Sequence, residues 1–122
     1  MHAGKGILTG FDTRPIATFS GLRGVPLLAL SHNALFPALR ILPHGIRIRV
    51  IRAHELAYDD LATVDFAQRL GWQVTFVPRQ GLRTFTAVFA GRNAAVVTLA
   101  MLHRNGGPLG TSAKAPLMSL ST

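Results

Sequence analysis

The feature that most constrains this chain is a strict alternation of apolar and polar residues in several short segments. Residues 46–50 read Ile, Arg, Ile, Arg, Val. Successive side chains of an extended strand point to opposite faces, so this segment presents one apolar and one charged face. The pattern predicts a strand of an antiparallel sheet that is buried on one side and solvated on the other.

Similar segments on both sides of this strand predict a small antiparallel β-structure. The predicted strands lie at residues 35–41, 46–50, 55–58, 62–68, 72–77 and 82–90. The side chains predicted to face the core are Leu35, Leu39, Ile41, Ile46, Ile48, Val50, Val64, Phe66, Trp72, Val74, Phe76, Phe85, Ala87 and Phe89. Turns are predicted at Pro43-His44-Gly45, at Asp59-Asp60 and at residues 78–81. The regular spacing predicts a small bent barrel or a sandwich.

One helix is predicted after the last strand, at residues 94–104. Asn93 offers an N-cap side chain, and Asn105-Gly106-Gly107-Pro108 is typical of a helix end followed by a breaker. At 100° per residue, one face of this helix carries Ala95, Val96, Leu99, Leu102 and the ring of His103. The sequence therefore predicts an α+β fold in which a single C-terminal helix closes the barrel or sandwich.

The two ends of the chain differ from this central unit of residues 35–106. Residues 1–34 are interrupted by glycine and proline, which leaves two interpretations, a loop-rich arm or extra edge strands. Residues 107–122 are small and mostly polar, and we expect a mobile tail there. With 122 residues, the chain is the size of one domain.

The central unit resembles the bacterial pleckstrin-homology-like (PH-like) domains. The resemblance is carried by the order of its elements, by the step Tyr58-Asp59-Asp60-Leu61-Ala62-Thr63-Val64 into a strand, and by the hairpin end Gly81-Leu82-Arg83-Thr84-Phe85-Thr86-Ala87. It covers about residues 35–106, and residues 1–34 have no counterpart in it. The resemblance implies a bent barrel capped by a helix. It also implies an interaction scaffold of membrane-associated or oligomeric bacterial proteins, without enzymatic activity.

The charge balance favours an anionic partner. The chain has 13 Lys and Arg against 5 Asp and Glu, for a net charge of +8, and eleven of the cations are Arg. The guanidinium group binds phosphates and carboxylates in a fork. The predicted anion-binding face consists of Arg47, Arg49, Arg52, Arg79 and Arg83. Its ligand would be nucleic acid or an anionic lipid headgroup, although a high genomic arginine content explains the basicity equally well.

Self-association or a protein partner is the first functional expectation. Val97 and Met101 lie on the predicted helix away from its core face, and the sheet has open edges. A two-fold homo-oligomer through this assembly face is the simplest arrangement. The sequence thus predicts a non-catalytic binding or self-assembly module, with anion binding as the alternative.

No motif of catalysis, nucleotide binding or metal binding is present in the sequence. The chain has no cysteine, and the densest group of other metal-ligating side chains lacks a known ligand spacing. That group consists of His44, His54, Glu55, Asp59 and Asp60. We expect no enzymatic activity, cofactor or metal. We also expect no transmembrane segment, and a cytoplasmic location that includes peripheral attachment to a membrane if the ligand is a lipid.

Overall fold

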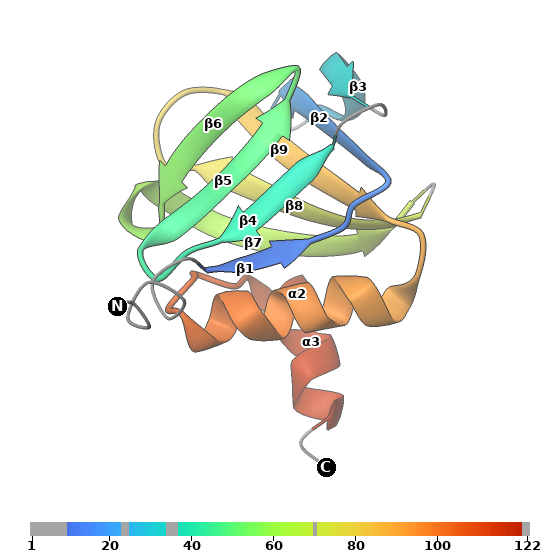
Figure 1. Cartoon of the computed structure of the whole chain (residues 1–122), viewed down its shortest axis with the longest axis vertical. Coiled ribbons are helices and arrows are strands. Elements are labelled where there is room, and N and C mark those ends of the chain that lie inside the picture. Colours follow the sequence, from blue (N-terminus) through green and yellow to red (C-terminus); the bar gives the residue numbers. More distant parts are fainter. Residues whose placement is uncertain (1–9, 23–24, 34–36, 70, 121–122) are drawn as a thin grey trace, which may run out of the picture.

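The computed structural model describes residues 10–22, 25–33, 37–69 and 71–120 (Figure 1). In chain order its elements are β1 (Phe11–Thr13), β2 (Ala17–Leu22), β3 (Val25–Asn33), β4 (Ala38–Ile41), β5 (Gly45–Val50), β6 (Arg52–Ala57), a 3-10 turn (Tyr58–Asp60), β7 (Leu61–Gln68), β8 (Trp72–Pro78), β9 (Arg83–Phe89), α2 (Arg92–Arg104) and α3 (Thr111–Leu120). The fold is therefore α+β, with the strands first and the helices last.

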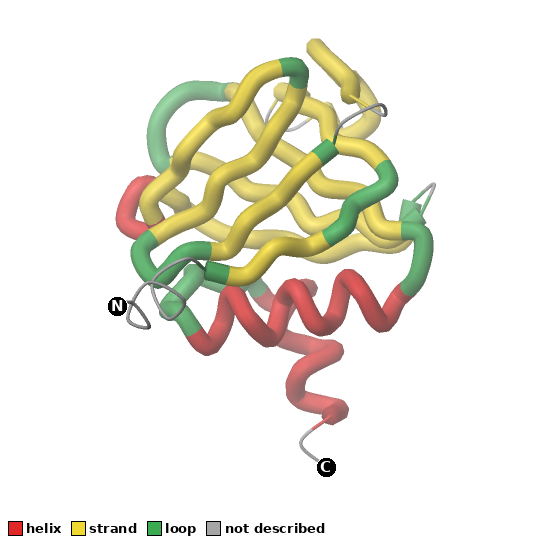
Figure 2. Tube along the Cα trace, in the orientation of Figure 1, coloured by secondary structure: helices red, strands yellow, loops and turns green. Residues whose placement is uncertain are grey.

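The strands form two antiparallel sheets that pack as a sandwich (Figure 2). Sheet A has the order β1-β4-β5-β6, and sheet B has the order β3-β2-β9-β8-β7. Consecutive strands change sheets between β1 and β2, between β3 and β4, and between β6 and β7. No pairing of described strands joins the sheets into a closed barrel, so of the two predicted architectures the structure has the sandwich.

The alternation in β5 is confirmed. Ile46, Ile48 and Val50 are almost completely buried, whereas Arg47 and Arg49 are exposed. In the neighbouring β4, the predicted inward residues Leu39 and Ile41 are buried as well, while Leu35 lies outside the described residues. The inner face of sheet A therefore follows directly from the period of two, because that face packs against the inner face of sheet B.

Strand β9 differs from the half-buried strand that its sequence predicts. Phe85, Ala87 and Phe89 face the core as expected, but Thr84, Thr86 and Val88 on the other face are buried too. The reason is the position of β9 between β2 and β8, in the middle of the five-stranded sheet. Neighbours on both sides shield its outer face: the hydroxyls of Thr86 and Thr75 lie 2.8 Å apart, and Phe19 is opposite Thr86 on β2.

Helix α2 lies across one end of the sandwich and contacts both sheets, through β1 and β4 on one side and β8 and β9 on the other (Figure 1). Its buried residues include the predicted Ala95, Val96, Leu99 and Leu102. The predicted inward position of His103 is wrong, because this residue is exposed.

The predicted start of α2 is also wrong by a few residues, whereas its predicted end is confirmed. Gly91 is the N-cap and forms no side-chain cap, so Asn93 lies inside the first turn. At the other end the backbone N–H of Gly107 donates to the Leu102 carbonyl at 2.8 Å, and that of Gly106 donates to the His103 carbonyl at 3.1 Å. Gly106 has a φ of 91°, so these bonds form a Schellman motif at the position where the sequence predicts the helix end.

The described part of residues 1–34 belongs to the same fold as the rest of the chain. Strand β1 pairs with β4 at the edge of sheet A, and β2 lies between β3 and β9 inside sheet B. Thr18 on β2 donates its buried hydroxyl to the Arg49 carbonyl on β5 and so links the two sheets. The N-terminal strands are thus part of the sandwich, and β2 is an inner strand.

The predicted mobile tail is wrong, because residues 111–120 form helix α3, which packs on β7 and α2. The outer edge of β7 explains the docking. The Val64 N–H donates to the Pro108 carbonyl at 2.9 Å, the Gly110 N–H donates to the Val64 carbonyl at 2.9 Å, and the Phe66 N–H donates to Ser112 Oγ at 3.0 Å. The segment before α3 therefore satisfies backbone groups that an open sheet edge would leave to solvent.

Helix α2 should be essential for the stability of the sandwich. Leu99 is completely buried, so Leu99→Asp would bury an unpaired carboxylate, at a cost that approaches the about 5–15 kcal/mol stability of a typical domain. We expect this variant to lack a cooperative thermal transition in circular dichroism. Ala100→Asp changes the next, exposed residue and should melt within a few degrees of the wild type. A cooperative Leu99→Asp transition at the wild-type temperature would contradict the packing of α2.

Tyr58 should stabilise the junction between the sheets through its hydroxyl. The ring is 8% exposed, and its hydroxyl donates to the Leu42 carbonyl at 2.6 Å. Burial raises the pKa of Tyr58 to about 12, so the donor stays protonated at neutral pH. Tyr58→Phe should lower the free energy of unfolding by about 1 kcal/mol, which corresponds to a fall of about 4 °C in melting temperature. An unchanged melting temperature would show that water replaces this hydrogen bond.

Candidate functional site

At the end of the sandwich opposite α2, β6 of sheet A begins at Arg52 and β9 of sheet B begins at Arg83. Figure 1 shows this end above the strands, away from the helices. Arg52 and His54 on β6 pair with Val50 and Ile48 on β5, so they share the inner face of sheet A with these buried residues. On β9 the residues at positions 83 and 85 share the inner face of sheet B with Ala87. We call this group the basic mouth; it consists of Ser20, Arg52, His54, Arg83 and Phe85.

Phe85 holds the basic mouth together. Its ring centroid lies 4.9 Å from that of His54, which brings β6 of one sheet into contact with β9 of the other. The Arg83 guanidinium carbon lies 5.1 Å from the centroid of the same ring, within the range of a cation–π interaction. Arg83 Nη2 also donates to Ser20 Oγ on β2 at 3.3 Å. An aromatic ring and a hydroxyl thus orient a guanidinium group at the opening between the sheets.

The electrostatics of the basic mouth are one-sided. Partial burial lowers the pKa of the His54 imidazole, and the positive charges of Arg83 and Arg52 lower it further. The ion pairs of the described residues lie elsewhere, between Arg40 and Asp12 and between Arg47 and Glu55. Within the described chain, the two mouth arginines therefore have no carboxylate partner. This excess of positive charge suits a bound anion.

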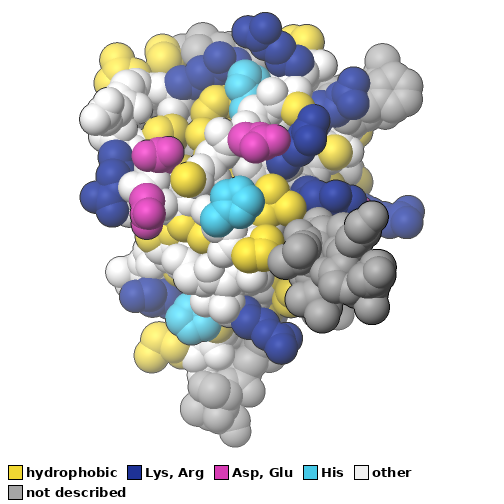
Figure 3. All heavy atoms as spheres, turned by 60° about the vertical axis from the view of Figure 1, so that its left-hand side comes forward, with side chains coloured by type: hydrophobic (Ala, Val, Ile, Leu, Met, Phe, Trp, Pro, Cys, Tyr) yellow, Lys and Arg dark blue, Asp and Glu magenta, His cyan; other side chains and the backbone are white. Residues whose placement is uncertain are grey.

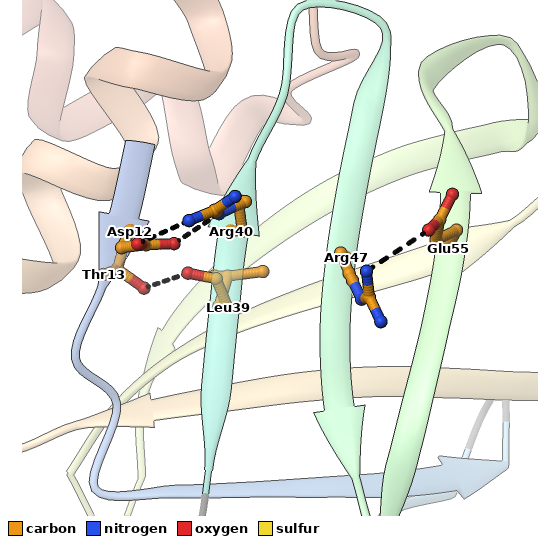
Figure 4. Close-up of polar contacts among 6 residues, drawn as sticks. All are labelled: Asp12, Thr13, Leu39, Arg40, Arg47 and Glu55. Atoms are coloured by element: carbon orange, nitrogen blue, oxygen red, sulfur yellow. Dashed lines mark hydrogen bonds and ion pairs between the residues drawn. The ribbon is translucent and has the colours of Figure 1, made fainter. Parts of the chain in front are cut away.

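The outer face of sheet A is charged but largely neutralised (Figure 4). Arg40 Nε and Nη2 donate to the two Asp12 oxygens at 2.6 and 2.9 Å, and Arg47 Nη1 lies 3.8 Å from a Glu55 oxygen. The pairing lowers the pKa of Asp12 and raises that of Arg40. Arg49 is flanked on the neighbouring strands by Ala38 and Ala53. Asp12 and the three arginines of this face, Arg40, Arg47 and Arg49, line a depression of about 400 Å³.

The structure divides the predicted anion-binding face among three places. Arg47 and Arg49 lie on the outer face of sheet A, whereas Arg52 and Arg83 lie in the basic mouth. Arg79 is exposed beside the β8–β9 turn, where its backbone N–H donates to the Asp60 carbonyl at 2.9 Å. Figure 3 shows Lys and Arg side chains gathered along the upper end of the molecule and down one flank.

The predicted assembly face is partly covered. Val97 is 49% exposed, but Met101 is half-buried and packs against the core. Helix α3, which the sequence analysis did not predict, packs against α2. The helix α2, which carries Val97 and Met101, is therefore already in contact with another helix of the same chain.

Three residues of the basic mouth were not included in the predicted site. Ser20 and Phe85 carry no functional signal in the sequence, because a serine in a strand and a core phenylalanine are both ordinary. In the sequence, His54 belongs to the densest group of metal-ligating side chains, but the described residues contain no group of three side chains that could hold a metal ion. One sequence feature does indicate the inward position of Arg52. It lies two residues after Val50, and so it continues the series of inward positions 46, 48 and 50.

Comparison with known proteins adds no family. The chain matches no protein-family profile and no curated protein sequence. Neither described helix has the length and the apolar composition needed to cross a membrane. The candidate function therefore rests on the geometry of the site.

The basic mouth should bind anions more tightly as the pH falls. The pKa of His54 in the folded protein lies below its usual value of about 6.5. The contribution of neutral His54 to folding stability is therefore fully present above about pH 6.5, and it is lost as the pH falls through the folded-state pKa. A bound anion favours the protonated imidazole. Heparin affinity should therefore rise by up to about fivefold through this residue as the pH falls from above about 6.5 through the folded-state pKa.

The matched variants for this experiment are His54→Gln and His44→Gln, measured by titration calorimetry with heparin. His44 is exposed in the β4–β5 turn, away from the mouth, so its variant should keep the wild-type pH dependence. His54→Gln should lose most of that dependence. The same dependence in both variants would remove His54 from the binding site.

Proposed function

We propose that this protein is a non-catalytic binding module of PH-like type that attaches to an anionic lipid surface through its basic mouth. The observation that carries the proposal is the combination of two arginines with two exposed aliphatic residues at one end of the sandwich. Ile51 directly precedes Arg52 in the β5–β6 turn, and Leu82 directly precedes Arg83 at the start of β9. The two arginines lie close enough to lower the pKa of the same histidine.

The aliphatic residues favour a lipid surface over a free anion. Ile51 is 65% and Leu82 is 66% exposed, so each mouth arginine has a large apolar side chain in solvent beside it in the sequence. Ile51 also has a φ of 64°, a conformation that β-branched residues rarely adopt. At the surface of a bilayer, guanidinium groups bind headgroup phosphates while adjacent apolar side chains enter the acyl boundary. This arrangement would give both exposed residues an apolar environment.

Nucleic acid fits this end of the molecule less well. Proteins that bind single strands place exposed aromatic rings among basic residues, on which bases stack. The rings of the basic mouth are those of Phe85 and His54. Phe85 is 6% exposed and lies beneath the Arg83 guanidinium group, and the half-buried ring of His54 packs against Phe85. The apolar residues that reach solvent there are aliphatic, and they offer no stacking surface.

The other arginine-rich surface is a weaker candidate for the same ligand. On the outer face of sheet A, Asp12 and Glu55 already accept bonds or ion pairs from Arg40 and Arg47. A phosphate that binds there would compete with these carboxylates for the arginines. At Arg52 and Arg83 it would meet no such competition, because no described carboxylate forms an ion pair with either residue. The PH-like part of the proposal is supported by the two antiparallel sheets and by the helix α2 across one end of them.

The proposal is tested by vesicle sedimentation with phosphatidylcholine vesicles that contain or lack phosphatidylserine. Arg52→Gln combined with Arg83→Gln should weaken binding to the anionic vesicles by about 30-fold, since each arginine near such a surface contributes about 1 kcal/mol. The matched control is Arg47→Gln with Arg49→Gln, which removes the same charge from the outer face of sheet A. We expect this control to bind within about threefold of the wild type.

A second pair of variants separates a lipid surface from a free anion. Ile51→Ser with Leu82→Ser should weaken vesicle binding and leave heparin binding unchanged, because only the bilayer takes up the aliphatic side chains. If the two double arginine variants lose the same amount of vesicle affinity, the attraction is due to the net charge of the whole protein and not to the basic mouth. Binding to single-stranded DNA but not to vesicles would contradict the lipid proposal.

A further inference from the structure

A second surface, at the opposite end of the molecule, has the features of a peptide-binding groove. It lies between residues 11–14, which are β1 and the residue after it, and the first turns of α2. Its volume is about 350 Å³. The lining includes Phe11, Asp12, Arg14, Phe89, Asn93 and Val97. Of these, Phe89 is completely buried, Phe11 is half-buried, and Val97 is 49% exposed on the helix.

The helix wall of this groove continues as an uncharged surface. Between Arg92 and His103 the sequence of α2 contains no charged residue, and its exposed positions there are Asn93, Ala94, Val97 and Ala100. A surface helix of a domain usually carries charged side chains on its outer side. The exposed side of α2 that borders the groove therefore carries no charge between Arg92 and His103.

The rim of the groove is basic. Arg14 belongs to the lining on the strand side and is exposed. On the helix side, Arg92 is exposed and directly precedes the lining residue Asn93. The carboxylate in the lining belongs to Asp12, and both of its oxygens accept hydrogen bonds from Arg40. No described carboxylate forms an ion pair with Arg14 or Arg92, because the two ion pairs of the described residues involve other arginines.

The positive charge beside the groove favours an acidic segment of another protein over a second copy of this chain as the ligand. A second copy of the chain would bring Arg14 and Arg92 towards the arginines of an identical surface on a molecule of net charge +8, and the resulting repulsion disfavours a two-fold contact here. An acidic segment meets complementary charge at both rims. Its apolar side chain would cover Val97 and the ring of Phe11.

We propose that the groove between β1 and α2 binds a short acidic segment of another protein. The segment places one aromatic or two aliphatic side chains in the groove and carboxylates beside Arg14 and Arg92. This mode is that of an anchor residue in a groove, in which apolar burial provides affinity and the flanking charges provide orientation. The groove lies at the α2 end and is independent of the lipid surface proposed for the basic mouth.

The test uses the full chain and a panel of fluorescent 12-residue peptides, with binding followed by anisotropy. Each peptide has a central Leu, Phe or Trp anchor flanked by Asp and Glu, by Lys, or by Ser. Peptides with acidic flanks and an apolar anchor should bind most tightly. Val97→Glu and Arg14→Glu should each weaken that binding at least tenfold, while the matched Ala100→Glu, which lies outside the groove lining, should change it less than threefold.

Three results would overturn the proposal. These are equal weakening by Ala100→Glu, equal binding of the lysine-flanked peptides, and the absence of saturable binding to every acidic peptide. Light scattering coupled to gel filtration tests the second copy: a dimer that Val97→Glu converts to a monomer would assign the groove to self-association instead. Arg14→Glu keeps the test informative if the helix variant is unstable. The Arg52→Gln, Arg83→Gln pair should bind the peptides normally, so failure of one proposal is distinguishable from failure of the other.

Discussion

The mutual burial of the inner faces of sheets A and B is the constraint on which the rest of the molecule depends. Leu39, Ile48, Phe76 and Phe89 are at most 1% exposed, although they come from four strands in two sheets. Apolar burial of this kind is the main favourable contribution to folding, and it leaves the alternate side chains of each strand on the outside. The separation of arginines from the core in β5 is a direct consequence.

A sandwich has two open ends, and this one closes them differently. Helix α2 covers one end with Ala95, Leu99 and Leu102, which continue the core. At the opposite end the inner faces finish in Arg52, His54 and Arg83, and the last two of these lie against the ring of Phe85. The apolar interior therefore ends in cationic groups that remain in contact with solvent. This difference between the two ends is the physical reason why we propose a lipid surface as the ligand of the cationic end and a protein partner near the α2 end.

The scarcity of acidic residues makes the position of each carboxylate decisive. Asp12 and Glu55 bind Arg40 and Arg47, so the outer face of sheet A carries fewer free cations than its sequence indicates. The arginines at the two ends are left without such partners among the described residues. With a net charge of +8, the distribution of five carboxylates thus decides which basic surfaces are available to a ligand.

The sequence by itself determined the features that depend on neighbours within a few residues. The period of two in β5 and the Schellman end of α2 are geometric properties of one strand and one helix, so residues 46–50 and 105–107 suffice to predict them. Only the tertiary structure decided which strands lie side by side. Thr86 became buried because β2 and β8 flank β9, and α3 formed on the free edge of β7. The contact of His54 with Phe85 arises across two sheets, and no local pattern encodes a contact between residues so distant in the chain.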